Sequence, residues 1–180
     1  MRKVVASYFL SLDGVAEEPE EFVDMTEVDE VMRENLGRAI AAQDAVLLGR
    51  GTYDVWAGFW PGSDVEPFAS FINGVQKFVV TSTPLEHEWA HTAVVEGGLA
   101  DFVAELKQQH GGDIGIGGSI SVTKSLLEAG LIDELRLVIA PAVQLHGRKL
   151  FDRASASRLS LIRSITSSAG YLLVDYTVSG

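Results

Sequence analysis

The sequence contains no cysteine among its 180 residues. This absence excludes a disulfide framework, a thiolate zinc site, an iron–sulfur cluster and a cysteine nucleophile. Positive charge is also scarce, because 14 Lys and Arg stand against 25 Asp and Glu, a formal net charge of −11. Nucleic-acid binding needs clustered basic residues, so the composition predicts no nucleic-acid partner.

Long apolar runs are missing too. No segment approaches the roughly 18–20 apolar residues that a membrane-spanning helix needs. The first apolar run ends at Ser11 and is followed by the turn pair Asp13-Gly14, without the small-residue cleavage site of a signal peptide. The four histidines lack the spacing of zinc ligands. We therefore expect a cytoplasmic protein with no membrane partner and no metal site.

Hydrophobic residues make up 47% of the chain and charged residues 22%, a composition that can form a buried core. The length fits one domain spanning residues 1–180. Strand-like and helix-like segments alternate along it. The strands are expected at 3–10, 45–48, 77–81, 114–116 and 135–139, and the helices at 25–40, 99–106 and 119–129.

The last part of the chain differs, because strand-like segments 159–165 and 171–178 are separated by only a short turn. The pattern predicts an α/β fold: a mainly parallel sheet with helices on both faces and an antiparallel hairpin at one edge. Asp24 and Glu27 form a candidate capping box for the first helix.

Two glycine-rich junctions each follow a predicted strand. The first is Gly49-Arg50-Gly51-Thr52, and the second is Gly117-Gly118-Ser119-Ile120. Glycine lets the backbone approach a ligand closely, and the N–H groups of a helix start attract phosphate. The first junction is equally compatible with a tight turn carrying a solvated arginine. The second matches neither the Rossmann nor the Walker spacing. Together they favour a bound nucleotide.

Other candidates are weaker. Thr81 and Ser82 follow a strand and suit either a phosphate or an ordinary turn into Pro84. Trp56, Phe59 and Trp60 suit core packing more than a ligand wall. His146, in the loop after a predicted strand, is the one histidine that merits testing, although a surface position is the simpler interpretation.

The ordered set of motifs resembles the dihydrofolate reductase-like superfamily, and within it the reductase domain of riboflavin-biosynthesis deaminase–reductases, the RibD C-terminal type. The resemblance spans residues 3–178 and rests on 11–14 (SLDG), 48–53 (LGRGTY), 80–82 (VTS), 117–118 (GG), 131–135 (LIDEL), 140–141 (AP), Gly147 and 150–151 (LF).

The resemblance implies a three-layer dihydrofolate reductase-like fold and an NADPH-dependent reductase. Gly49, Arg50, Gly51 and Thr52 would hold phosphates, with Arg50 and Ser82 near the 2′-phosphate and Thr81 and Ser82 beside the adenosine. The diphosphate would rest on Gly117, Gly118, Ser119 and Ile120. Ala6, Asp13 and Gly14 would line the nicotinamide end.

The implied substrate is a small heterocycle, foremost of the 5-amino-6-(5-phosphoribosylamino)uracil reductase type. A dihydrofolate or pterin reductase, a catalytically silent nucleotide-binding protein, and a reductase using a flavin or deazaflavin stay open. The candidates for proton delivery are Asp13, Glu27, Asp29 and His146. Arg148, Lys149 and Arg153 are candidates for a ribose phosphate. The resemblance also implies a homodimer, with the C-terminal strands as its expected interface.

Two departures qualify the resemblance. The chain carries no zinc-deaminase half, so a riboflavin role would be a stand-alone one. The Pro-Trp segment that folate reductases carry before the first helix is missing.

Overall fold

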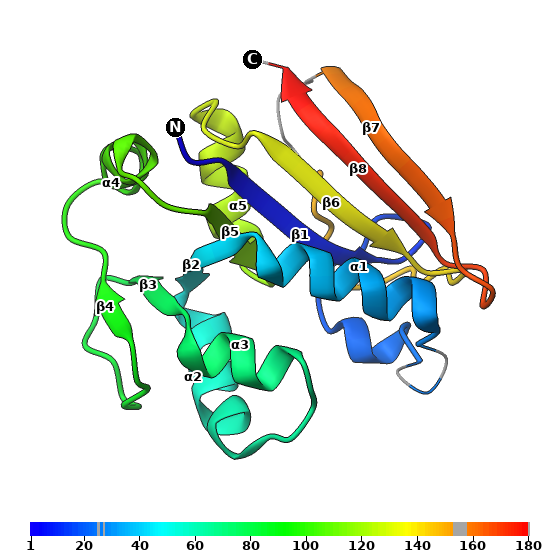
Figure 1. The fold of residues 1–180 in the computed structure, drawn as a ribbon, viewed down its shortest axis with the longest axis horizontal. Helices are drawn as coiled ribbons and strands as arrows, with labels where there is room; N and C mark the ends of the chain where they lie inside the picture. The colour runs from blue at the N-terminus through cyan, green and yellow to red at the C-terminus, as the bar shows by residue number, and fades with distance from the viewer. Residues whose placement is uncertain (25, 27, 153–157, 180) are drawn as a thin grey trace.

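The computed structural model describes residues 1–24, 26, 28–152 and 158–179. Strands and helices alternate as the sequence predicts (Figure 1). The strands are β1 (Val4–Leu10), β2 (Gln43–Gly49), β3 (Gln76–Val80), β4 (Thr92–Val94), β5 (Asp113–Gly117), β6 (Glu134–Ile139), β7 (Arg158–Thr166) and β8 (Leu172–Ser179). The α-helices are α1 (Glu30–Ala41), α2 (Arg50–Phe59), α3 (Phe68–Gly74), α4 (Leu99–Gln108) and α5 (Ile120–Glu128).

The strands form one eight-stranded sheet in the order β4-β3-β2-β5-β1-β6-β8-β7. The pairs from β4 to β6 are all parallel, and β8 pairs antiparallel with both β6 and β7. The C-terminal hairpin therefore extends a parallel sheet. This confirms the predicted fold class: an α/β sandwich of the dihydrofolate reductase-like kind, with a mixed, mainly parallel sheet and an antiparallel hairpin at one edge.

The sheet has helices on both faces because successive strand residues point to opposite sides. On one face, alternate residues of β1 such as Val4 and Ala6 pack in one core with residues of α4 and α5. On the other face, Val46 and Leu48 of β2 pack with residues of α2 and α3. Figure 1 shows α1 in front of the sheet and α5 behind it, so the molecule has three layers.

The first helix begins later than the apolar spacing predicts. Its N-terminal residue is Glu30, and Asp29 caps it by accepting a hydrogen bond from the N–H of Met32 at 3.0 Å. The predicted capping box is wrong, because Asp24 instead accepts bonds from the main chain and hydroxyl of Thr26. Glu27 lies outside the described residues.

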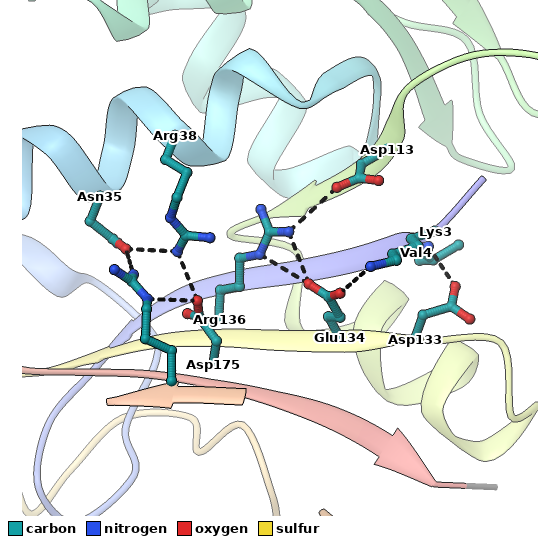
Figure 2. Close-up of polar contacts among 10 residues, drawn as sticks. Lys3, Val4, Asn35, Arg38, Asp113, Asp133, Glu134, Arg136 and Asp175 are labelled. Carbon is teal, nitrogen blue, oxygen red and sulfur yellow. Dashed lines mark hydrogen bonds and ion pairs between the residues drawn. The ribbon is translucent and has the colours of Figure 1, made fainter. Parts of the chain in front are cut away.

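The amino-end edge of the sheet, where β1, β2, β5 and β6 begin, carries a network of ion pairs (Figure 2). Arg136 donates to Glu134 at 2.9 Å and to Asp113 at 3.4 Å, and Lys3 donates to Glu134 at 2.7 Å. The side chain of Arg136 is only 10% exposed. Farther along the same face, Asp175 receives bonds from two further arginines, Arg38 and Arg163.

Candidate functional site

The candidate site lies at the carboxyl-end edge of the sheet, where β1, β2, β3, β5 and β6 end. The two glycine-rich junctions meet there because β2 and β5 are neighbours and run parallel. Gly49 ends β2 and is the N-cap of α2, and Gly117 ends β5 two residues before Ser119, the N-cap of α5. This position is where α/β sheets usually hold their ligands.

Neither α2 nor α5 has a side-chain cap at its N-terminus. The first N–H groups of a helix have no partner within the helix, and the helix dipole makes this end positive. Two adjoining uncapped starts therefore present a surface suited to an anion. In most helices a Ser at the N-cap would satisfy one of these donors.

Ser119 is the N-cap residue, but its hydroxyl is used to join the two junctions. It accepts a hydrogen bond from the N–H of Gly49 at 2.7 Å and donates to the hydroxyl of Thr52 at 3.0 Å. The side chain is buried. Ser119 thus holds the start of α2 against the start of α5, which explains why a serine at this position leaves its own helix uncapped.

The glycines of the second junction are required by close packing. A Cβ on Gly117 would lie 3.0 Å from the ring of Trp56, and one on Gly118 would lie 3.2 Å from the methyl group of Thr52. Gly118 also has a φ of +67°, a left-handed conformation that side chains disfavour. Glycine at these two positions thus allows the junction to pack directly against α2.

Arg50 reaches from the start of α2 to the loop that follows β3. Its Nε donates to both carboxylate oxygens of Asp54 at 2.8 Å, and Nη1 donates to the hydroxyl of Thr83 at 2.6 Å and to the carbonyl of Pro84 at 2.7 Å. Glu86 lies 3.4 Å from Nη2. These partners were not predicted from the sequence, although the i,i+4 spacing of Arg50 and Asp54 is typical of an ion pair on a helix.

Thr81 and Ser82 occupy this same loop. The hydroxyl of Thr81 donates to the carbonyl of Thr83 at 2.9 Å, as in an ordinary turn, and the side chain of Ser82 is exposed. The side chain of Arg50, at the start of α2, therefore reaches the loop that contains Ser82. Their predicted role at a 2′-phosphate stays a prediction.

Ala6 lies in the middle of β1, and its side chain is in the core. It is 0% exposed and packs on the face of the sheet that α4 and α5 cover. Its place at the nicotinamide end stays a prediction. Gly14, by contrast, lies at the carboxyl-end edge in a turn, with a φ of +87° and its N–H bonded to the carbonyl of Ser11.

Asp13 anchors a second loop to this turn. Its carboxylate accepts bonds from the N–H groups of Gln144 at 2.9 Å and Leu145 at 3.1 Å and from the hydroxyl of Ser11 at 2.8 Å. The bonds from Gln144, Ser11 and Leu145 lower the pKa of Asp13 to about 2. The carboxylate is thus ionised at neutral pH, which suits an anchor better than a proton donor.

The first-helix carboxylate Asp29 is also engaged. Besides capping α1, it accepts two bonds of 2.7 Å from the hydroxyl and N–H of Ser168. The bond from the Ser168 hydroxyl lowers the pKa of Asp29 most. The bonds from the N–H groups of Met32 and Ser168 lower it further. Glu27, the other first-helix candidate, lies outside the described residues.

His146 lies in the loop that Asp13 anchors, and its side chain is exposed. It follows Leu145, which has a positive φ of 66°, and precedes Gly147, whose added Cβ would lie 2.9 Å from Val15. The loop is therefore packed closely onto the turn after β1. This arrangement brings His146 to the carboxyl-end edge, as the sequence predicts.

Trp56 and Trp60 pack edge to face with Phe68, with ring centroids 5.6 Å and 4.8 Å away. They belong mainly to the core between α2 and α3, and Phe59 is 55% exposed. Within the described residues no group of acidic and histidine side chains could hold a metal ion. In that same part of the chain, no helix is long and apolar enough to cross a membrane.

The fold is dihydrofolate reductase-like. A solved dihydrofolate reductase from Enterococcus faecalis, in complex with NADP(H), matches 99% of this chain and 97% of its own at a TM-score of 0.66 and 14% identity. A riboflavin biosynthesis protein from Shewanella sp. PV-4 matches 99% of both chains at a TM-score of 0.77 and 20% identity.

The sequence comparison makes the assignment more specific. The family model of the RibD C-terminal domain matches residues 2–173, and the chain belongs to this family. It is also 26% identical over 185 residues to the protein YyaP of Bacillus subtilis (strain 168), covering 99% of this chain and 96% of that protein. A deaminase/reductase from Thermotoga maritima matches at a TM-score of 0.68, and the alignment covers 57% of that longer chain.

Proposed function

We propose that the protein is an NADPH-dependent reductase that transfers a hydride to a small heterocycle of the 5-amino-6-(5-phosphoribosylamino)uracil type in the cytoplasm. Membership of the RibD C-terminal domain family supports a reductase of riboflavin-biosynthesis type. The observation that carries the cofactor assignment is the pair of adjoining, uncapped helix starts at the carboxyl-end edge of the sheet.

The residues at this edge fit a dinucleotide. Gly117 and Gly118 let the start of α5 pack closely against Trp56 and Thr52 of α2, and the N–H groups at the start of α5 suit a diphosphate. Gly49, Gly51 and Thr52 offer the matching start of α2. Arg50 and Ser82 are the proposed neighbours of the 2′-phosphate, where an incoming phosphate would compete with Glu86 for the guanidinium of Arg50.

NADPH, when bound, supplies a hydride from its reduced nicotinamide ring. The chain itself has to orient the two reactants and exclude water. The turn at Asp13 and Gly14 and the loop that Asp13 anchors lie together at this edge, and we place the nicotinamide beside them. Because Asp13 and Asp29 are ionised and hydrogen-bonded, His146 is the proposed proton donor.

A fluorescence titration of the purified protein with NADPH and with NADH tests the cofactor assignment. We expect NADPH to bind more tightly. Arg50→Ala should lower NADPH affinity by about 1.5–3 kcal/mol, because a charged hydrogen bond is lost. Arg33→Ala, at an exposed arginine of α1, is the matched control. NADPH binding that is unchanged in Arg50→Ala would exclude our placement of the 2′-phosphate.

Turnover is tested separately by following NADPH oxidation with the phosphoribosylaminouracil and with dihydrofolate. Oxidation with the first substrate alone is the expected result. A nucleotide-binding protein without turnover is the second candidate, because the two described carboxylates proposed for proton delivery are both engaged as hydrogen-bond acceptors. Tight NADPH binding without NADPH oxidation in the presence of either substrate would favour this second candidate.

We also propose a homodimer that forms through the C-terminal hairpin. β7 ends the strand order, so one side of its backbone lacks a partner strand, and such an edge readily pairs with another chain. Leu161, Ile162 and Leu172 are 57%, 51% and 42% exposed there. Leu161→Asp should give a monomer by sedimentation equilibrium, whereas Val55→Asp, at an exposed apolar residue of α2, should not.

A further inference from the structure

Two polar atoms on the central strands are buried without a hydrogen-bond partner in the described part of the chain. They are Oγ of Ser7, on β1, and Nη1 of Arg136, on β6. A buried donor that is left without a partner costs about 1–3 kcal/mol, so such groups are rare in native folds. Ser7 and Arg136 are paired in register on neighbouring strands. The two unpartnered groups therefore lie side by side.

Both side chains lie on the face of the sheet that α1 and α2 cover. Ala6 packs with α4 and α5, so the next residue of β1, Ser7, points to the opposite side, and so does its register partner Arg136. Ser7 is also in register with Gly117 of β5, whose added Cβ would lie 3.0 Å from the ring of Trp56 on α2. Gly117, Ser7 and Arg136 thus form one row across three strands.

The guanidinium of Arg136 reaches across β1, because Nη2 donates at 3.4 Å to Asp113 of β5, which lies on the other side of β1 from β6. Nε and Nη2 also donate to Glu134, and Nη1, which carries no dashed line in Figure 2, points away from that carboxylate. Lys3 donates to Glu134 as well, so two cations meet two carboxylates here. Because the charges balance, the unused donor suits a neutral acceptor such as a carbonyl oxygen.

Solvent reaches this row at Ser7. The residues of β1 that face α4 and α5 are all buried, whereas Ser7 and Phe9, on the opposite face, are half-buried. The backbone of β1 is paired on both sides, so the exposed area of Ser7 lies on its side-chain face. Rotation about the Cα–Cβ bond turns the hydroxyl toward this exposed side. Its neighbour in the row, Gly117, ends β5 at the candidate site.

We propose that Ser7 and Arg136 together bind a carbonyl oxygen of the substrate ring, so that the protein selects heterocycles of the uracil class. This inference rests on the proposed function, because it names the ring group that the same site recognises. A hydroxyl and a guanidinium N–H both donate, so the ring atom that fits them is an acceptor. A ring with an amino group at this position would leave Nη1 unpaired, and such a mismatch is strongly rejected.

The test compares the binding of two small rings by isothermal titration calorimetry. One is 5,6-diaminouracil, which has ring carbonyl groups, and the other is 4,5,6-triaminopyrimidine, which has none. The wild type should bind the first about tenfold more tightly, and Ser7→Ala should lose most of this preference. Ser7→Thr keeps the hydroxyl and should keep the preference. Ser160→Ala, at an exposed serine of β7, is the matched control.

A second variant addresses the guanidinium. Arg136→Lys keeps a cation near Glu134 and Asp113, but its single ammonium group is held by these carboxylates and cannot replace Nη1. It should therefore also lose the preference for 5,6-diaminouracil. A preference that persists in both Ser7→Ala and Arg136→Lys would overturn the inference.

Thermal unfolding separates ring binding from a structural role of Ser7. Replacing an unpartnered buried hydroxyl by a methyl group should leave Tm unchanged or raise it. A lower Tm in Ser7→Ala, together with unchanged binding of 5,6-diaminouracil, would show that Oγ is satisfied within the folded protein and would overturn the inference.

The remaining outcomes distinguish this inference from the proposed function. A wild type that prefers 5,6-diaminouracil through Ser7, but binds neither NADPH nor NADH, would refute the proposed function alone. A wild type that oxidises NADPH with the phosphoribosylaminouracil, but binds both small rings equally or binds neither, would refute the inference alone.

Discussion

The two edges of the sheet use polar residues in opposite ways. At the amino-end edge, where the parallel strands begin, four cations are matched with carboxylates: Arg2 with Asp44, Lys3 with Glu134, Arg136 with Glu134 and Asp113, and Lys107 with Asp133. Figure 2 shows the pairs of Lys3 and Arg136. At the carboxyl-end edge two helix starts are uncapped, and the guanidinium of Arg148 forms no ion pair with a carboxylate among the described residues; its Nη2 donates to the hydroxyl of Ser121.

The difference separates charges that are paired within the fold from charges and donors that stay available at the proposed site. A buried ion pair gives little net stability compared with apolar packing, but it disfavours every arrangement that leaves a charge unpaired. The amino-end network therefore specifies how the starts of β1, β5 and β6 are aligned. The carboxyl-end edge has donors and positive charge left over, which is what an anionic cofactor requires.

Breaking the amino-end network should give the largest effect. Arg136→Ala removes the buried partner of Glu134 and Asp113 and should lower the free energy of unfolding by about 3–5 kcal/mol. Urea denaturation measures this. Arg33→Ala breaks the exposed Arg33–Glu30 pair and should change stability by less than about 1 kcal/mol. Equal effects of the two substitutions would refute the contrast between structural and exposed charges.

Lys77, near the start of β3, gives a second test at the amino-end edge. It is 0% exposed, donates to the carbonyls of Ile72 and Val75, and burial lowers its pKa to about 8. The unfolded chain therefore binds more protons between pH 8 and the ordinary value of 10.5. Stability should rise with pH across this window, by at most about 1.4 kcal/mol per pH unit.

Denaturation at a series of pH values checks this expectation. Lys77→Met should lose the rise, whereas Lys124→Met, on α5, should keep it. A pH profile that is the same in Lys77→Met and in the wild type would show that another group titrates in this window.

At the carboxyl-end edge, Gly118→Ala should lower stability by about 1–2 kcal/mol, because the left-handed φ of +67° is strained for alanine. It should also weaken NADPH binding, since the new methyl group crowds Thr52. Gly58→Ala is the control: nothing lies within 4 Å of its added Cβ, and we expect a gain of about 0.5–1 kcal/mol. Both effects are measured by denaturation and titration.

The smallest expected effect is local. Asp13→Asn should lower global stability slightly at neutral pH, because the amide keeps one of the two acceptor oxygens, and should speed hydrogen exchange at the N–H groups of Gln144 and Leu145. Because the folded pKa of Asp13 is lowered from 3.8 to about 2, the contribution of this carboxylate is present above pH 4 and is lost as the pH falls toward 2. Asp64→Asn, in another exposed loop, should change neither amide.

Much of the fold was predictable because apolar periodicity and glycine punctuation are local signals. Five parallel strands and the hairpin lie where the sequence predicts them. β4 was missed because it spans only Thr92–Val94 at the edge of the sheet, and α3 because it is a seven-residue helix without a clear start signal. The start of α1 was misplaced because an apolar pattern continues ahead of its cap, Asp29.

The site was predictable only in outline. Parallel strands bring the two glycine junctions to one edge, so their meeting followed from topology. The roles of individual polar side chains could not be predicted in this way, because their hydrogen-bond partners are distant in sequence. Asp13 bonds to Gln144, 131 positions away, and Ser119 bonds to Gly49, 70 positions away. The burial of the Ala6 side chain was not predicted either, because the sequence does not reveal which face of β1 the helices α4 and α5 cover.

The hydrogen bonds from the loop after β6 to the carboxylate of Asp13 have a consequence for the affinity of any ligand bound beside that loop. A loop that is free before binding loses conformational entropy when a ligand orders it, and that loss weakens the complex. Here the N–H groups of Gln144 and Leu145 are held in the folded chain, and Glu17 holds the N–H of Arg148. The conformational entropy of this loop is therefore lost during folding, before any ligand binds. A ligand that binds beside the loop contacts a surface that is already ordered.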